Sequence, residues 1–209
     1  MNIISYMAWF PLVFYSIIFP AAVYFYLAKK SFWGLIKATA LFYFAFASLK
    51  TWFQYQLWSN TGFGRVLLES SLDPSVPGFF GKLRLLTESS GGYFFYYALS
   101  RFWFNFLATA LVAVLFYFFL KLLEKRWPRF FEPFEPELGL LLGLFCGWPL
   151  FLLFLPLSFT LMILFSLAMS VFFKQNRVTL GPPLLLGAAL TLVFGGYLSK
   201  FISLSSLKI

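Results

Sequence analysis

The chain has 209 residues, of which 61% are hydrophobic and 11% are charged, whereas about a quarter of the residues of an ordinary soluble domain are charged. So few charges leave no polar shell for a water-soluble domain. The net charge of +9 does not indicate nucleic-acid binding, because the basic residues lie between apolar runs and line no single face. We therefore expect one all-α transmembrane domain over residues 1–209.

Six apolar runs of about the length that a helix needs to cross a bilayer predict a polytopic bundle. They cover residues 8–28, 35–57, 93–120, 138–154, 156–173 and 179–199. The first run has no basic residue before it, unlike a cleavable signal, so it is expected to remain as a span. The fourth and fifth runs share one uncharged stretch. We divide it between Pro149 and Pro156, because proline interrupts helices, and expect a tight helical hairpin there.

The distribution of Lys and Arg predicts the orientation of the helices. One side of the predicted membrane holds nine of them: Lys29, Lys30, Lys37, Lys121, Lys125, Arg126, Arg129, Lys174 and Arg177. The other side holds five: Arg65, Lys82, Arg84, Lys200 and Lys208. Because short cytoplasmic loops carry the excess of basic residues, both termini are expected on the non-cytoplasmic side, in a membrane such as the bacterial inner membrane.

The long connection 58–92 is expected on the outer side. Its stretches 61–71 and 79–86 mix apolar with charged residues, and a turn signal rich in Pro, Asp and Gly separates them over 73–78. We predict two short amphipathic helices that lie along the membrane surface. A loop that binds a partner is the alternative interpretation.

Several chemistries are excluded by composition. The chain has no histidine and one cysteine, Cys146, which excludes His-ligated haem or zinc, imidazole triads and thiolate clusters. Phosphate-binding and dinucleotide-binding glycine motifs are also missing, so neither a cofactor nor a metal is expected. None of the seven acidic residues falls in the middle of a predicted span, where it would indicate an ion path. Three of them, Glu132, Glu135 and Glu137, precede the fourth span, where acids favour a helix N-terminus.

Small residues mark the faces on which helices are expected to pack. Gly139, Gly143 and Gly147 recur at every fourth position of the fourth span and form one smooth stripe. Ser166 and Ser170 form a similar but weaker stripe on the fifth span. We expect a helix of the same chain against these stripes, and another subunit is the alternative.

The C-terminal stretch carries a further pattern. A Gly-Trp pair at 147–148 follows Gly143, Glu135 precedes them, and a Gly-Pro pair at 181–182 opens the last span. Over less than a third of the chain this pattern resembles the last three helices of the type IV prepilin peptidases. In that family a Gly-x-Gly-Asp motif opens the helix that runs to the Gly-Trp pair, and Glu135 stands here where the Asp is expected. The resemblance implies a membrane peptidase in which two aspartates activate water.

The chain departs from the family at the catalytic positions. It has a single Asp, Asp73, expected on the outer side, and Pro133 and Phe134 replace the glycines before the motif. Glu69 and Glu135 are the acids that would have to serve instead. They are expected on opposite faces of the membrane, which favours a fold retained without the peptidase chemistry.

These observations support three functional hypotheses. The first is a non-catalytic integral membrane subunit or scaffold, whose partners are the lipid bilayer and other membrane protein subunits. The second is an intramembrane enzyme of prepilin-peptidase-like fold that uses Glu135 and Glu69. The third is a carrier of a small substrate, with a polar cavity bordered by Gln54, Arg101 and Asn105.

Overall fold

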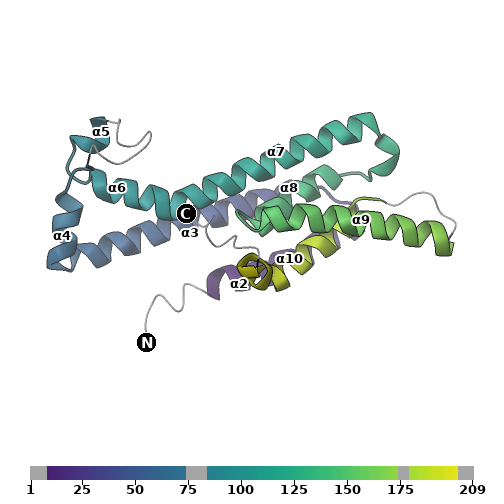
Figure 1. Cartoon of the computed structure of the whole chain (residues 1–209), viewed down its shortest axis with the longest axis horizontal. Helices are drawn as coiled ribbons and strands as arrows, with labels where there is room; N and C mark the ends of the chain where they lie inside the picture. The colour runs from purple at the N-terminus through teal and green to yellow at the C-terminus, as the bar shows by residue number, and fades with distance from the viewer. Residues whose placement is uncertain (1–8, 74–83, 174–178, 202–209) are drawn as a thin grey trace. The chain divides into compact units, whose positions relative to one another are not determined.

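The computed structural model describes residues 9–73, 84–173 and 179–201, and every regular element among these residues is a helix (Figure 1). The all-α prediction is therefore confirmed. The elements are α2 (Trp9–Leu27), α3 (Trp33–Ser59), α4 (Gly62–Glu69), α5 (Arg84–Thr87), α6 (Gly92–Ala98), the π-helix η2 (Leu99–Trp103), α7 (Phe104–Arg126), the 3-10 helix η3 (Pro128–Phe130), α8 (Glu135–Cys146), α9 (Phe151–Phe173) and α10 (Gly181–Phe201).

Three helical stretches are long and apolar enough to cross a membrane. They are Trp9–Leu27, the 35-residue stretch Gly92–Arg126 and Phe151–Phe172. The second of these is continuous because the π-turn of η2 joins α6 to α7 without a break. The chain therefore has the helices of an integral membrane protein. Both termini lie outside the described residues.

The hairpin of the C-terminal half differs from its predicted boundaries. The predicted end of the helix 138–154 is wrong, since α8 ends at Cys146 and α9 already begins at Phe151. Gly147, with a φ of 61°, and a cis peptide bond before Pro149 form the turn. Pro156 lies inside α9 and Pro20 lies inside α2, because neighbouring helices let a membrane helix tolerate proline. Proline thus marks the turn at 149 and not at 156.

The described residues fall into two compact units, one within 1–40 and 109–208 and the other within 41–108. In the first unit the chain turns back after α7, so that α8, α9 and α10 follow as antiparallel neighbours (Figure 1). Every residue of α8 from Leu138 to Cys146 is buried. At about 1.5 Å per residue its 12 residues extend about 18 Å. α8 is therefore a short helix in the core of this unit, enclosed by longer ones.

Aromatic contacts organise the second unit. The Trp103 indole N–H donates a hydrogen bond to Thr51 Oγ1 at 3.1 Å, and Trp58 stacks on Tyr93 with 6.2 Å between the ring centroids. α4 lies within the predicted segment 61–71, and the Thr61 hydroxyl caps it by accepting from the Gly64 N–H. The predicted segment 79–86 lies mostly outside the described residues, and only its end belongs to α5.

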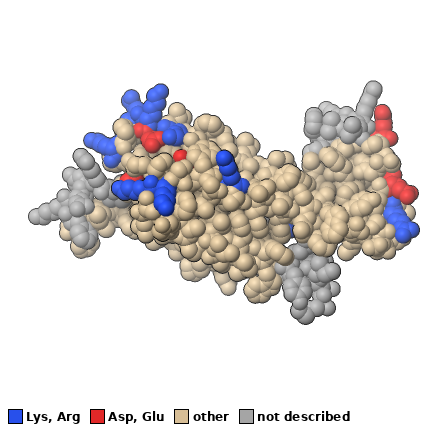
Figure 2. All heavy atoms as spheres, turned by 180° about the vertical axis from the view of Figure 1, so that it is seen from behind, with Lys and Arg blue, Asp and Glu red and all other residues tan. Residues whose placement is uncertain are grey.

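Charged side chains of the first unit gather at one end of its helices (Figure 2). That end comprises the C-terminal ends of α2 and α7 and the N-terminal ends of α3 and α8. Its basic residues are Lys29, Lys30, Lys37, Lys121, Lys125, Arg126 and Arg129, and its acidic residues are Glu124, Glu132, Glu135 and Glu137. The acidic residues at the start of α8 thus lie where several helix ends meet.

Candidate functional site

The acidic segment 132–137 forms the turn that leads into α8 and the first residues of that helix. The left-handed conformation of Phe134, with a φ of 69°, redirects the chain immediately before the helix. Glu135 and Pro136 then open α8, where proline loses no helical hydrogen bond. A carboxylate at this position is also favoured by the dipole of α8 itself.

Glu135 is fully buried, with 0% of its surface exposed, and donors from three other residues satisfy its carboxylate. Oε1 accepts from the Gly181 backbone N–H at 2.6 Å and from the Tyr26 hydroxyl at 3.4 Å. Oε2 accepts from the Glu132 backbone N–H at 3.0 Å. The Tyr26 hydroxyl also lies 3.4 Å from Thr179 Oγ1. Because Gly181 is the first residue of α10, Glu135 joins the N-terminus of that helix to α8 and α2.

Glu137 makes the equivalent connection to α3. Its Oε2 accepts from the Phe32 backbone N–H and from the Ser31 hydroxyl, both at 2.8 Å. These residues immediately precede Trp33, where α3 begins. The first backbone N–H groups of a helix have no partner within the helix, and a carboxylate satisfies them well. We call Glu135 and Glu137, with the helix starts that they bind, the carboxylate junction.

Burial controls the ionisation of Glu135. Removal from water raises the pKa of its carboxyl from 4.5 to about 7, and the negative charge of Glu132 acts in the same direction. The backbone N–H groups of Glu132, Gly181 and Leu180 oppose this rise, because they stabilise the ionised form. Glu135 therefore exchanges its proton near neutral pH, whereas an ordinary carboxyl is already ionised there.

Glycine is required at the start of α10 by the same junction. A Cβ atom at Gly181 would overlap the ring and hydroxyl of Tyr26. The absence of a side chain lets α2 and α10 approach closely enough for both to reach Glu135. The junction is thus built from residues that are far apart in sequence and closely packed in space.

The predicted glycine stripe of α8 lies against α7. A Cβ atom at Gly139 would overlap Leu120, and one at Gly143 would lie 3.2 Å from Ala113 Cβ and 3.3 Å from Ala113 Cα. At Gly147 the nearest atom would be Thr109 Oγ1, at 3.4 Å. Their neighbours on α7 are spaced by one and by two helical turns, so the stripe forms a close helix–helix contact within the first unit.

The two serines predicted to pack against a helix do not lie at a helix contact within the first unit. Ser166 and Ser170 are both exposed on α9. Their place on that helix is therefore an outer surface of the first unit.

The other predicted acid, Glu69, ends α4 in the second unit and has an exposed side chain. The residues predicted for a carrier belong to the second unit as well. Arg101 is exposed within η2, while Gln54 and Asn105 are half-buried. Among the described residues, no three Cys, Asp or Glu side chains gather in a way that could hold a metal ion.

Tyr26, Thr179 and Ser31 were not predicted as site residues. Tyr26 is 109 positions from Glu135, and Ser31 is 106 positions from Glu137, so no local pattern links them. The sequence offers one signal for a partner of Glu135, the Gly-Pro pair at 181–182. This pair opens a helix, and the first N–H groups of a helix need an acceptor from outside it. The chain matches no protein-family model, no curated protein and no solved structure.

Proposed function

We propose that this protein is a non-catalytic subunit or scaffold of a larger membrane protein complex. The observation that carries the proposal is the carboxylate junction. The two carboxylates at Glu135 and Glu137 accept hydrogen bonds from the starts of other helices. Glu135 is closed to solvent, and a catalytic acid or base must reach its substrate or a water molecule.

Exposed aromatic side chains support the proposal that the protein belongs to a larger membrane protein complex. On α3, Phe44, Trp52 and Tyr55 are 51%, 56% and 47% exposed. Aromatic residues contribute large contact areas and are enriched in protein interfaces. They are therefore the first positions at which we expect another membrane protein to pack.

The proposal includes six membrane crossings with both termini outside, in a membrane such as the bacterial inner membrane. The crossings beyond the three long apolar stretches would be α3, the apolar part of α8 from Leu138 onward with its turn, and α10, so that Glu135 lies outside the spans. α8 is short for a span, but protein and not lipid encloses it, which permits irregular backbone at membrane depth. The basic residues gathered at one end of the first unit support a cytoplasmic assignment for that end.

Photo-cross-linking in native membranes tests the subunit role. A photoreactive phenylalanine analogue replaces Trp52, and in a matched control it replaces Phe154, which is 0% exposed. We expect the Trp52 position to give a discrete adduct with another membrane protein, and the Phe154 position to give none. Lipid adducts alone at Trp52 and at each other exposed aromatic position tested would contradict the proposal.

A second candidate function is an intramembrane enzyme that uses Glu135 as its acid. The pKa near 7 favours it, because a general acid works best when its pKa is close to the operating pH. The test is Glu135→Gln in cells that co-express a prepilin. Unchanged cleavage and methylation of that prepilin would eliminate this candidate, and loss of both with the protein still folded would favour it over the scaffold.

A further inference from the structure

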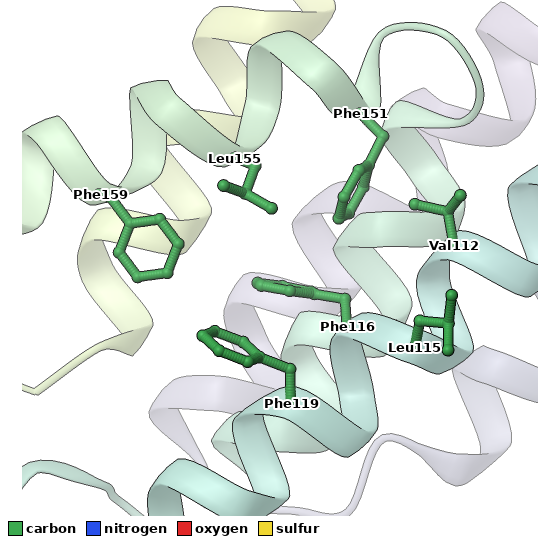
Figure 3. A pocket seen from close by; sticks show the side chains of 7 residues that line it. All are labelled: Val112, Leu115, Phe116, Phe119, Phe151, Leu155 and Phe159. Atoms are coloured by element: carbon green, nitrogen blue, oxygen red, sulfur yellow. The ribbon is translucent and has the colours of Figure 1, made fainter.

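An apolar groove runs between α7 and α9 in the first unit and has a volume of about 280 Å³ (Figure 3). Its α7 wall is formed by Val112, Leu115, Phe116 and Phe119. These residues follow the spacing of a single helix face. Phe116 is buried at the floor, whereas Leu115 and Phe119 are 58% and 44% exposed at the rim.

The α9 wall repeats every fourth residue. It consists of Phe151, Leu155 and Phe159, which point toward the α7 side chains in Figure 3. The rings of Phe119 and Phe159 lie 6.5 Å apart between centroids. Both walls belong to helices that are long and apolar enough to cross a membrane, so the groove opens toward hydrocarbon.

The face of α7 that lines the groove ends in a basic residue. Arg126 lies seven positions after Phe119, which is two helical turns, so it shares that face about 10 Å farther along. Its side chain is exposed. Lys125 lies on a different face, and Lys121 forms an ion pair with Glu124 at 3.0 Å.

The corresponding face of α9 carries hydroxyl groups toward the same end. Ser166 lies seven positions after Phe159, and Ser170 lies four positions further. Both are exposed. Hydroxyl groups can donate hydrogen bonds to phosphate oxygens. The two helix faces that line the groove thus continue beyond it into a basic residue on α7 and hydroxyl groups on α9.

We propose that this groove binds one anionic phospholipid, with an acyl chain between α7 and α9 and the phosphate beside Arg126. The dimensions agree, because Arg126 is ten residues from the floor residue Phe116, or about 15 Å along the helix. That is half of the about 30 Å hydrocarbon thickness, the depth of one leaflet.

Native mass spectrometry of the purified full chain tests the proposal independently of the subunit role. The delipidated protein is titrated with phosphatidylglycerol and, separately, with phosphatidylcholine of the same acyl chains. We expect one saturable phosphatidylglycerol per chain, bound about fivefold more tightly than phosphatidylcholine, the effect of one basic residue near an anionic headgroup. Equal binding of the two lipids would overturn the proposal.

Two pairs of variants locate the lipid. Arg126→Ala should reduce phosphatidylglycerol binding about fivefold, while Lys125→Ala, which removes the same charge from another face, should change it less than twofold. Leu155→Trp should fill the groove and weaken both lipids. Leu152→Trp, at a 41% exposed position of α9 outside the groove, should not.

Two further outcomes would contradict a lipid site. Equal effects of Arg126→Ala and Lys125→Ala would show that only net charge matters. Unchanged lipid binding in Leu155→Trp would show that the lipid does not lie in the groove. This holds whether or not the substitution also changes the mass of a complex that contains the protein.

Discussion

Glu135 should make the stability of the folded protein depend on pH in a direction opposite to that of an ordinary paired carboxylate. Its pKa is about 7 when folded and 4.5 when exposed, so between these values the folded chain binds more protons than the unfolded chain. Stability therefore falls as pH rises through this interval. The stabilisation that comes from protonated Glu135 in the folded chain is fully present below about pH 4.5 and is lost above about pH 7.

The size of the effect follows from the difference in pKa. Each pKa unit corresponds to about 1.4 kcal/mol, so the difference of about 2.5 units corresponds to about 3 kcal/mol. In a chain of this length that is a change in Tm of roughly 6–12 °C. Screening by solvent is small at this position, because the side chain is completely buried.

Thermal unfolding in detergent at pH 5 and pH 8 measures this effect. The variant Glu135→Gln removes the titrating group and should lose the fall in Tm that the wild type shows. Glu69→Gln, at an exposed position, is the matched control and should keep it. A Glu135→Gln variant with the same pH dependence as the wild type would refute the assignment of this effect to Glu135.

Further substitutions test how the helices are held together. Gly143→Val should destabilise the fold by about 1–3 kcal/mol, because even its Cβ would press on the Ala113 backbone. The same change at Gly34, where an added Cβ meets nothing within 4 Å, should alter unfolding by less than about 0.5 kcal/mol; similar melting of the two variants would argue against the α7–α8 contact. Glu137→Ala should cost about 1–2 kcal/mol in chemical denaturation through loss of the cap on α3. Glu124→Ala, which breaks only an exposed pair, should cost less than about 0.5 kcal/mol, and equal costs would contradict the capping role of Glu137.

The sequence predicts the helices well where apolar runs are long and bordered by charges. Each predicted span overlaps a helix, since a bilayer requires apolar runs of a defined length. The boundary between α8 and α9 failed because both Pro149 and Pro156 were read as interruptions. Pro156 is the sixth residue of α9, and tertiary packing accommodates it.

The candidate site was only partly predictable. The glycine stripe and the acidic segment at the start of α8 could be recognised because their members are close in sequence. The partners of the acids could not, since Gly181 is 46 positions from Glu135 and Phe32 is 105 positions from Glu137. Such pairs form only when the helices pack.

The most direct test of the proposed role is the mass of the particle extracted from native membranes in a mild detergent, with identification of whatever co-migrates. The subunit role predicts a particle in which the 24.1 kDa chain is joined by at least one other membrane protein in a fixed ratio. A particle that contains this chain alone with its detergent and lipid would contradict that role.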